Sequence, residues 1–165
     1  SFAFCRECTG PKQMTIIAWD GKTLAADKAS TSVGYARTVT KIFRVPEGLV
    51  GFAGCAEHAM QLLEWFMASR PSGEFPKRAK DEECAGALFI GNDGVCWGYG
   101  ATPYPERVEE RFDAIGCGRD YALAAMHLGH DARHAVEVAC ALDVNCGKGI
   151  DTLALNEACE EKHDI

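Results

Sequence analysis

Two apolar segments that meet at Asp20-Gly21 constrain the fold of this chain more than any other feature of its sequence. Both segments are rich in residues that favour strands, and an Asp-Gly pair between such segments is typical of a tight turn with positive φ. The sequence therefore predicts a β-hairpin over residues 14–27. Thr15 would start one strand, Asp27 would end the other, and we expect these two positions to pair across the hairpin.

The other patterns fall into blocks of strands and helices. We expect strands over residues 39–45, 49–53, 85–91, 95–99, 107–115 and 150–155. We expect helices from 56 to near 70, from 121 to 130 and from 132 to 142, the last capped by Asp131, and loops over 28–38, 71–83 and 143–149. Blocks of this kind favour an α+β fold in which sheets pack together and helices cover their outer faces.

The composition excludes several classes of protein. The 165 residues are 47% hydrophobic and 25% charged, which is typical of a single soluble domain. A net charge of -7 argues against nucleic acid or a membrane surface as the main partner, because phosphate binding requires concentrated Lys and Arg. There is no apolar run near the ~20 residues of a membrane span and no signal-peptide core. We expect a cytoplasmic protein.

The cysteines do not resemble a disulfide framework. They are nine in number and scattered, whereas disulfide scaffolds are usually smaller and rich in loops, so we expect reduced and mostly buried thiols. The one close pair, Cys5 and Cys8, lacks the second pair or the two histidines of a zinc site. We therefore expect neither a metal nor a cofactor.

Thr15 directly follows Met14, so cleavage between them would make Thr15 the first residue. An N-terminal threonine supplies both a hydroxyl nucleophile and a free amine that acts as its base. Asp27 and Lys41 are expected on neighbouring strands, where an ion pair beside Thr15 would favour the deprotonated nucleophile. Gly54 lies between a strand and a helix, and its free backbone N–H would hold the oxyanion of a tetrahedral intermediate.

Several segments in register carry a family resemblance. They are Thr15-Ile16-Ile17-Ala18-Trp19-Asp20-Gly21, Leu24-Ala25-Ala26-Asp27, Thr40-Lys41-Ile42, Gly51-Phe52-Ala53-Gly54, and Ile115-Gly116-Cys117-Gly118 followed by Tyr121-Ala122. With these segments the chain resembles the proteasome β-subunit family, and most of all the bacterial HslV-type peptidases. The resemblance extends over nearly all of residues 15–155.

The resemblance implies an N-terminal-nucleophile (Ntn) hydrolase, with a four-layer αββα sandwich over residues 15–155. Residues 1–14 would be an N-terminal extension or pro-segment, and residues 156–165 a charged tail. The implied activity is that of a threonine peptidase. By position, Thr15 would be the nucleophile, Lys41 would lower its pKa, Asp27 would orient Lys41, and Gly54 would donate to the oxyanion.

The resemblance also implies supporting residues and partners. Cys117, Asp143 and Cys146 fall where the family has Ser, Asp and Ser, with Gly147 and Asp151 also in register. A thiol is a poorer hydrogen-bond donor than a hydroxyl, so we expect a weaker or rearranged network around the amine. Positions Val39, Phe52 and Ala56 would line an apolar specificity pocket. The partners implied are a peptide or unfolded protein substrate, identical subunits in a ring, and an ATP-dependent unfoldase.

Other interpretations stay open. If residues 1–14 remain attached, Thr15 has an amide in place of an amine, and the chain would be a non-catalytic or unprocessed relative that acts as an assembly or binding module. Cys117 would be a nucleophile itself if it met one of the histidines His127, His130 and His134, although their spacing is equally natural on a solvated helix face. Ser1 and Cys5 are further candidate nucleophiles.

Overall fold

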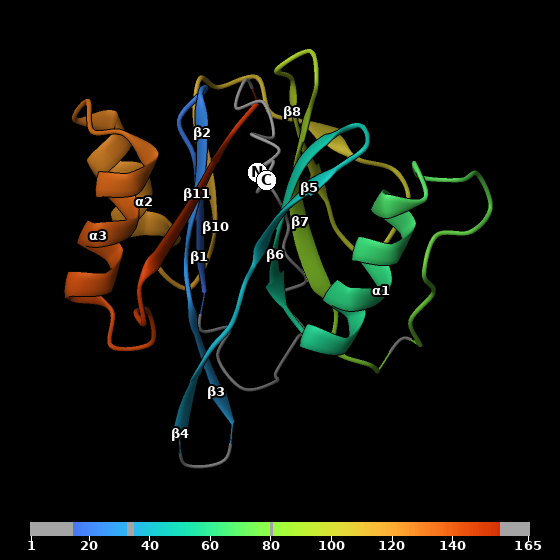
Figure 1. Cartoon of the computed structure of the whole chain (residues 1–165), viewed down its shortest axis with the longest axis horizontal. Coiled ribbons are helices and arrows are strands. Elements are labelled where there is room, and N and C mark those ends of the chain that lie inside the picture. The colour runs from blue at the N-terminus through green and yellow to red at the C-terminus, as the bar shows by residue number, and fades with distance from the viewer. Residues whose placement is uncertain (1–14, 33–34, 80, 156–165) are drawn as a thin grey trace, which may run out of the picture.

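The computed structural model describes residues 15–32, 35–79 and 81–155, where the chain forms a mixed α/β fold with antiparallel sheets and three helices. Two sheets lie face to face (Figure 1). Helices α2 (Arg119–His127) and α3 (Ala132–Leu142) lie outside one sheet, and α1 (Ala56–Met67) lies outside the other. The predicted extension and charged tail lie outside the described residues, as do Ser1, Cys5 and Cys8.

The first sheet contains the hairpin at Asp20-Gly21. Its four antiparallel strands follow the order β10-β1-β2-β11, with β1 (Ile16–Trp19), β2 (Thr23–Asp27), β10 (Asp113–Gly116) and β11 (Ile150–Ala154). The hairpin joins β1 to β2, and β11 extends the sheet beyond β2. The start of β1 and the end of β2 therefore lie at the same end of this sheet.

The register of this hairpin differs by one residue from the expected register. Ile17 pairs with Ala26, so the next position along the ladder places Asp27 opposite Ile16. The predicted pairing of Thr15 with Asp27 is therefore wrong. The cause lies in the turn, where the backbone N–H of Asp20 donates to the Thr23 carbonyl at 3.3 Å, so that the two residues between them form the turn.

The second sheet has five antiparallel strands in the order β5-β6-β7-β8-β9. They are β5 (Ile42–Val45), β6 (Gly48–Gly54), β7 (Ala85–Gly91), β8 (Cys96–Tyr99) and β9 (Glu106–Arg107). The single strand expected over residues 107–115 is wrong, because β9 belongs to this sheet and β10 to the other. The chain between β9 and β10 crosses from one sheet to the other.

The segment expected as a loop over residues 28–38 is instead a third, two-stranded sheet. It consists of β3 (Ala29–Ser32) and β4 (Tyr35–Thr38), which extend beyond the body of the molecule (Figure 1). The backbone N–H of Val39 donates to the Lys28 carbonyl at 2.8 Å and closes the base of this arm. β4 is exposed to solvent along its whole length, which agrees with the absence of large aliphatic residues from both strands of the arm.

The central strands of both main sheets, β1, β2, β6 and β7, are buried on two faces. In β1, Ile16 and Ala18 pack with α2 and α3, whereas Ile17 and Trp19 face the second sheet. An ideal Cβ on Gly51 would lie 2.7 Å from the Ile17 Cγ2, so the glycine permits close approach of the two sheets. Burial on both faces explains why these strands are apolar at successive positions rather than at alternate ones.

Helix α1 packs an aromatic cluster onto the outer face of the second sheet. Leu62, Trp65 and Phe66 are buried there, and the Trp65 and Phe66 ring centroids lie 5.2 Å apart. Met67, the last residue of α1, is 53% exposed. None of the helices in the described part of the chain is long and apolar enough to cross a membrane.

Candidate active site

Thr15 lies at the head of β1 and is held there by the segment that follows β10. It is only 7% exposed, and its carbonyl accepts a hydrogen bond from the backbone N–H of Gly118 at 3.4 Å. Gly116 has φ +106°, and a Cβ at this position would lie 2.0 Å from the Thr15 carbonyl oxygen. A side chain at residue 116 would thus displace Thr15, which explains the glycine of the Gly116-Cys117-Gly118 segment.

An ion pair between Lys41 and Asp27 lies beside Thr15. The Lys41 Nζ is 2.7 Å from the Asp27 Oδ1, and the two side chains are 8% and 0% exposed. Asp27 ends β2 in the first sheet, whereas Lys41 immediately precedes β5 in the second. The expectation that they occupy neighbouring strands is therefore wrong, because the ion pair bridges the two sheets.

The Asp27 carboxylate is enclosed by hydrogen-bond donors. Its Oδ1 accepts from the backbone N–H of Ile16 at 3.1 Å as well as from Lys41, and its Oδ2 accepts from the backbone N–H groups of Gly147 at 3.0 Å and Ala29 at 3.3 Å. A buried charge requires such partners, since it has lost its hydration. Asp27 thereby fixes the Lys41 ammonium in one place.

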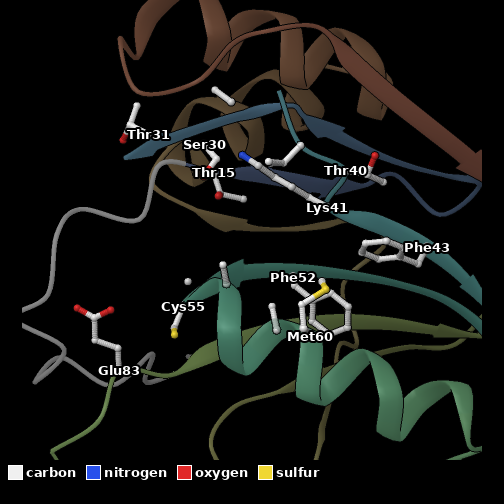
Figure 2. A pocket seen from close by; sticks show the side chains of 15 residues that line it. Thr15, Ser30, Thr31, Thr40, Lys41, Phe43, Phe52, Cys55, Met60 and Glu83 are labelled. Carbon is white, nitrogen blue, oxygen red and sulfur yellow. The ribbon is translucent and has the colours of Figure 1, made fainter. Parts of the chain in front are cut away.

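The Lys41 ammonium points toward Thr15 in the site. Figure 2 shows the extended Lys41 side chain with its nitrogen directed at Thr15 and Ser30, across the cleft from α1. A fixed positive charge close to a hydroxyl lowers the free energy of its deprotonated form. The Lys41 end of the sheet-bridging ion pair therefore faces Thr15.

Cys117 and Cys146 lie next to the Thr15 backbone. The Thr15 nitrogen donates to the Cys117 Sγ at 3.3 Å, and the Cys117 and Cys146 sulfur atoms are 3.7 Å apart. Asp143 belongs to the same group, since one ligand atom from each of the three side chains lies within 4.8 Å of the others. The three positions given by the resemblance are thus brought together next to the Thr15 nitrogen.

The two thiols have opposite pKa shifts. The hydrogen bond from Cys146 lowers the pKa of Cys117, against the effect of burial and with help from the Thr15 N–H. The same hydrogen bond, with burial, raises the pKa of Cys146. The contact between the two thiols therefore favours ionisation of Cys117 over that of Cys146.

A cleft of about 560 Å³ opens in front of Thr15 and Lys41 (Figure 2). Val39, Phe52 and Ala56, the expected pocket residues, all line it, and so does Gly54, which has φ 113° at the end of β6. Sequence reasoning did not identify its other lining residues, which are Ala29, Ser30, Thr31, Thr40, Phe43, Cys55, Ala59, Met60 and Glu83. Most of the wall is apolar, so the cleft suits an apolar side chain.

A sequence signal existed for some of the cleft residues that were not predicted. Ala59 and Met60 follow Ala56 by three and four positions, which places all three on one side of α1. Glu83 had no such signal, because it precedes β7 and reaches the cleft only through the tertiary fold (Figure 2).

The alternative Cys–His site is not supported by the structure. His127, His130 and His134 are exposed, and the Nδ1 of His134 lies 2.7 Å from the Asp131 Oδ1. Cys117 instead contacts Thr15 and Cys146. His127 ends α2, His130 lies between the two helices and His134 lies in the first turn of α3, so the three are exposed to solvent but do not share one helix face.

The likeness of this chain to known proteins lies in its fold. No protein-family model and no curated protein match the chain. Among solved structures, it is similar to Thiobacillus denitrificans BPH, with a TM-score of 0.61 and 20% identity over 87% of this chain and 99% of that chain. It is equally similar to that protein in complex with epoxomicin, with a TM-score of 0.61 and 19% identity over 84% and 96%. The likeness is one of fold.

Proposed function

We propose that this protein is a threonine peptidase with an Ntn-hydrolase fold of the proteasome and HslV type. The observation that carries the proposal is the buried 2.7 Å ion pair of Lys41 with Asp27, placed beside Thr15 at the mouth of an apolar cleft. The similar fold of a protein solved with epoxomicin supports it. In this proposal the residues before Thr15 are removed, and the freed α-amine becomes the base.

The proposed reaction begins with attack of the Thr15 hydroxyl on the scissile carbonyl. The α-amine of Thr15 takes the hydroxyl proton, while the Lys41 ammonium stabilises the developing alkoxide. The backbone N–H of Gly54 donates to the oxyanion of the tetrahedral intermediate. Collapse of the intermediate breaks the C–N bond, the amine returns its proton to the leaving nitrogen, and an ester forms on Thr15. Water then hydrolyses this ester.

The cleft supports a preference for substrates with a large apolar residue next to the cleaved bond. Phe43, Phe52 and Met60 gather on one side of it (Figure 2), and Val39 adds a further apolar contact. Burying an apolar side chain of the substrate there would contribute about 25 cal/mol for each Å² removed from water. An acidic side chain would gain no cation in that part of the wall.

The test of the proposal begins with the intact mass of the purified protein. A species that begins at Thr15, hydrolysis of short peptides with an apolar residue, and covalent inactivation by epoxomicin are the expected results. Thr15→Ala should abolish hydrolysis without changing the circular dichroism spectrum. The matched control is Thr152→Ala, on an exposed position of β11, which should retain full activity.

The competing function is that of a non-catalytic assembly or binding module. In the uncleaved chain the Thr15 nitrogen is an amide, and an amide has no basic lone pair for the proposed step. If the protein stays full-length, hydrolyses no peptide and does not react with epoxomicin, the peptidase proposal fails and the module is favoured. Turnover that survives Thr15→Ala would instead assign the nucleophile to another residue.

We also propose that identical subunits form a closed ring with the Thr15 cleft facing an inner chamber, served by an ATP-dependent unfoldase. A head-to-tail interface that closes on itself is the geometric requirement. Analytical ultracentrifugation should give the mass of an oligomer, several times the mass of one chain. A monomer at micromolar concentration contradicts the ring.

A further inference from the structure

The cluster beside the Thr15 nitrogen has the composition of a metal site. In the part of the chain that the structure describes, Cys117, Asp143 and Cys146 are the one group of three potential metal ligands whose donor atoms lie within 4.8 Å of one another. Two of the ligands are sulfur, and all three are at least half-buried. Two thiolates with one carboxylate suit a thiophilic divalent cation such as Zn²⁺, rather than Mg²⁺ or Ca²⁺.

The spacing of the two sulfur atoms fits tetrahedral coordination. Two sulfur atoms that each lie ~2.3 Å from one zinc ion at the tetrahedral angle are ~3.8 Å apart. The Cys117 and Cys146 sulfur atoms are 3.7 Å apart. This separation is far longer than the ~2.05 Å of a disulfide bond, so the sulfur atoms are already at the spacing that a shared cation requires.

The Thr15 nitrogen lies beside this group, at a distance from the Cys117 sulfur close to that of a further ligand. A nitrogen and a sulfur bound to the same zinc ion are ~3.6 Å apart, and the Thr15 nitrogen lies 3.3 Å from the Cys117 Sγ. In the uncleaved chain this nitrogen is an amide that donates its hydrogen, so water would complete the coordination. A free amine at the same place would offer a lone pair to the cation.

We propose that Cys117, Asp143 and Cys146 bind one Zn²⁺ ion, and that the α-amine of a processed Thr15 completes its coordination. This site departs from the sequence-based expectation of no metal. Binding would release the thiol protons and occupy the lone pair of the amine. The consequence for activity rests on the proposed peptidase function: Zn²⁺ would remove the general base and act as a reversible inhibitor.

The binding test uses Co²⁺ as a coloured substitute for Zn²⁺. Full-length protein with Cys5→Ser and Cys8→Ser, which removes the other close cysteine pair, is titrated with Co²⁺ in a phosphine reductant. We expect one Co²⁺ per chain, with visible bands of tetrahedral cobalt and a sulfur-to-cobalt charge-transfer band. Zn²⁺ should bleach both. Absence of the charge-transfer band, or loss of all binding with the Cys5–Cys8 pair, overturns the proposal.

Ligand variants locate the site. Cys117→Ser, Cys146→Ser and Asp143→Asn should each weaken binding by roughly tenfold or more. Cys140→Ser is the matched control, because Cys140 is half-buried against the same core cluster but outside the ligand group, and it should bind as before. If a variant misfolds, the unsubstituted protein provides a second test. In that protein, bound Zn²⁺ should protect Cys117 and Cys146 from an alkylating reagent. Equal alkylation with and without Zn²⁺ contradicts the site.

A separate activity measurement distinguishes this inference from the peptidase proposal. If processed protein hydrolyses peptides, Zn²⁺ should inhibit it, a chelator should restore it, and Cys146→Ser should make it at least about tenfold less sensitive. If the protein binds Zn²⁺ at the cluster but hydrolyses nothing, the metal site stands and the peptidase proposal fails. If the protein hydrolyses peptides but shows no cobalt–thiolate band, the peptidase proposal stands and the metal site fails.

Discussion

The Lys41 ammonium and the Asp27 carboxylate lie 2.7 Å apart and join two sheets that share no strand. Asp27 also accepts hydrogen bonds from Ile16 and Gly147, so one carboxylate connects the start of β1, the end of β2 and the loop before β11. The position of Thr15 depends on these contacts. A substitution that breaks the Lys41–Asp27 ion pair should therefore lower both stability and activity.

Asp27→Asn should destabilise the fold by about 3 to 5 kcal/mol, because it leaves the buried Lys41 without a counter-charge. Urea denaturation measures the change in the free energy of unfolding. Asp151→Asn is the matched control, since it breaks the more exposed pair with Lys28 and should cost at most about 1 kcal/mol. Equal costs for the two variants would show that the Lys41–Asp27 pair is not effectively buried.

Gly116→Ala should destabilise the protein and remove activity, because the new Cβ would lie 2.0 Å from the Thr15 carbonyl oxygen. Gly94→Ala separates this clash from backbone strain. Gly94 also has positive φ, at +82°, but nothing lies within 4 Å of its Cβ position, so it should cost only about 1 to 3 kcal/mol and leave activity intact. Thermal unfolding and peptide hydrolysis check both variants; equal losses contradict the close contact with Thr15.

Val39→Asp should change the substrate preference of the cleft. A carboxylate in the apolar wall should lower kcat/KM for peptides with a large apolar residue by roughly 10 to 100-fold and lower it much less for peptides with a basic residue. The control is Val144→Asp, since Val144 is 98% exposed and outside the cleft. Unchanged selectivity in Val39→Asp would place the specificity pocket elsewhere.

The pair of Asp131 and His134 should make the cap of α3 dependent on pH. The hydrogen bond with Asp131 raises the pKa of His134 from its ordinary 6.5, and the backbone and side-chain hydrogen bonds from His134 lower the pKa of Asp131 from 3.8. The stabilisation is therefore complete between pH 3.8 and 6.5. It declines as pH rises through the raised pKa of His134, or falls through the lowered pKa of Asp131.

Titration of the His134 ring by NMR measures this effect. Asp131→Asn keeps an oxygen that can accept from the His134 N–H but removes the charge, so the pKa of His134 should return toward its ordinary value. Stability measured at pH 5 should then fall, while stability at pH 9 should change little. An unchanged titration curve in Asp131→Asn would show that the pair does not form in solution.

Local sequence signals predicted the elements whose cause is local. The Asp20-Gly21 hairpin, the cap at Asp131 and helix α3 occur as expected, because turn and capping hydrogen bonds join residues only a few positions apart. The prediction of a loop over residues 28–38 was wrong, because these residues form the two strands of the β3–β4 arm. The prediction of one strand over residues 107–115 was also wrong, because this segment contributes strands to two different sheets. The segment's own apolar pattern does not specify which sheet a strand joins.

The sequence by itself indicated which chemical groups the candidate site contains: the residue pattern predicted Thr15, Asp27, Lys41 and Gly54, and the family resemblance added the cysteines at 117 and 146. Only the tertiary structure decided how they meet. It places Lys41 directly before β5 of the other sheet, and two sulfur atoms 3.7 Å apart beside the Thr15 nitrogen. The contacts of Lys41 with Asp27 and of Thr15 with Cys117 join residues 14 and 102 positions apart, so strand pairing and packing across the whole chain, not any local preference of the backbone, determine these distances.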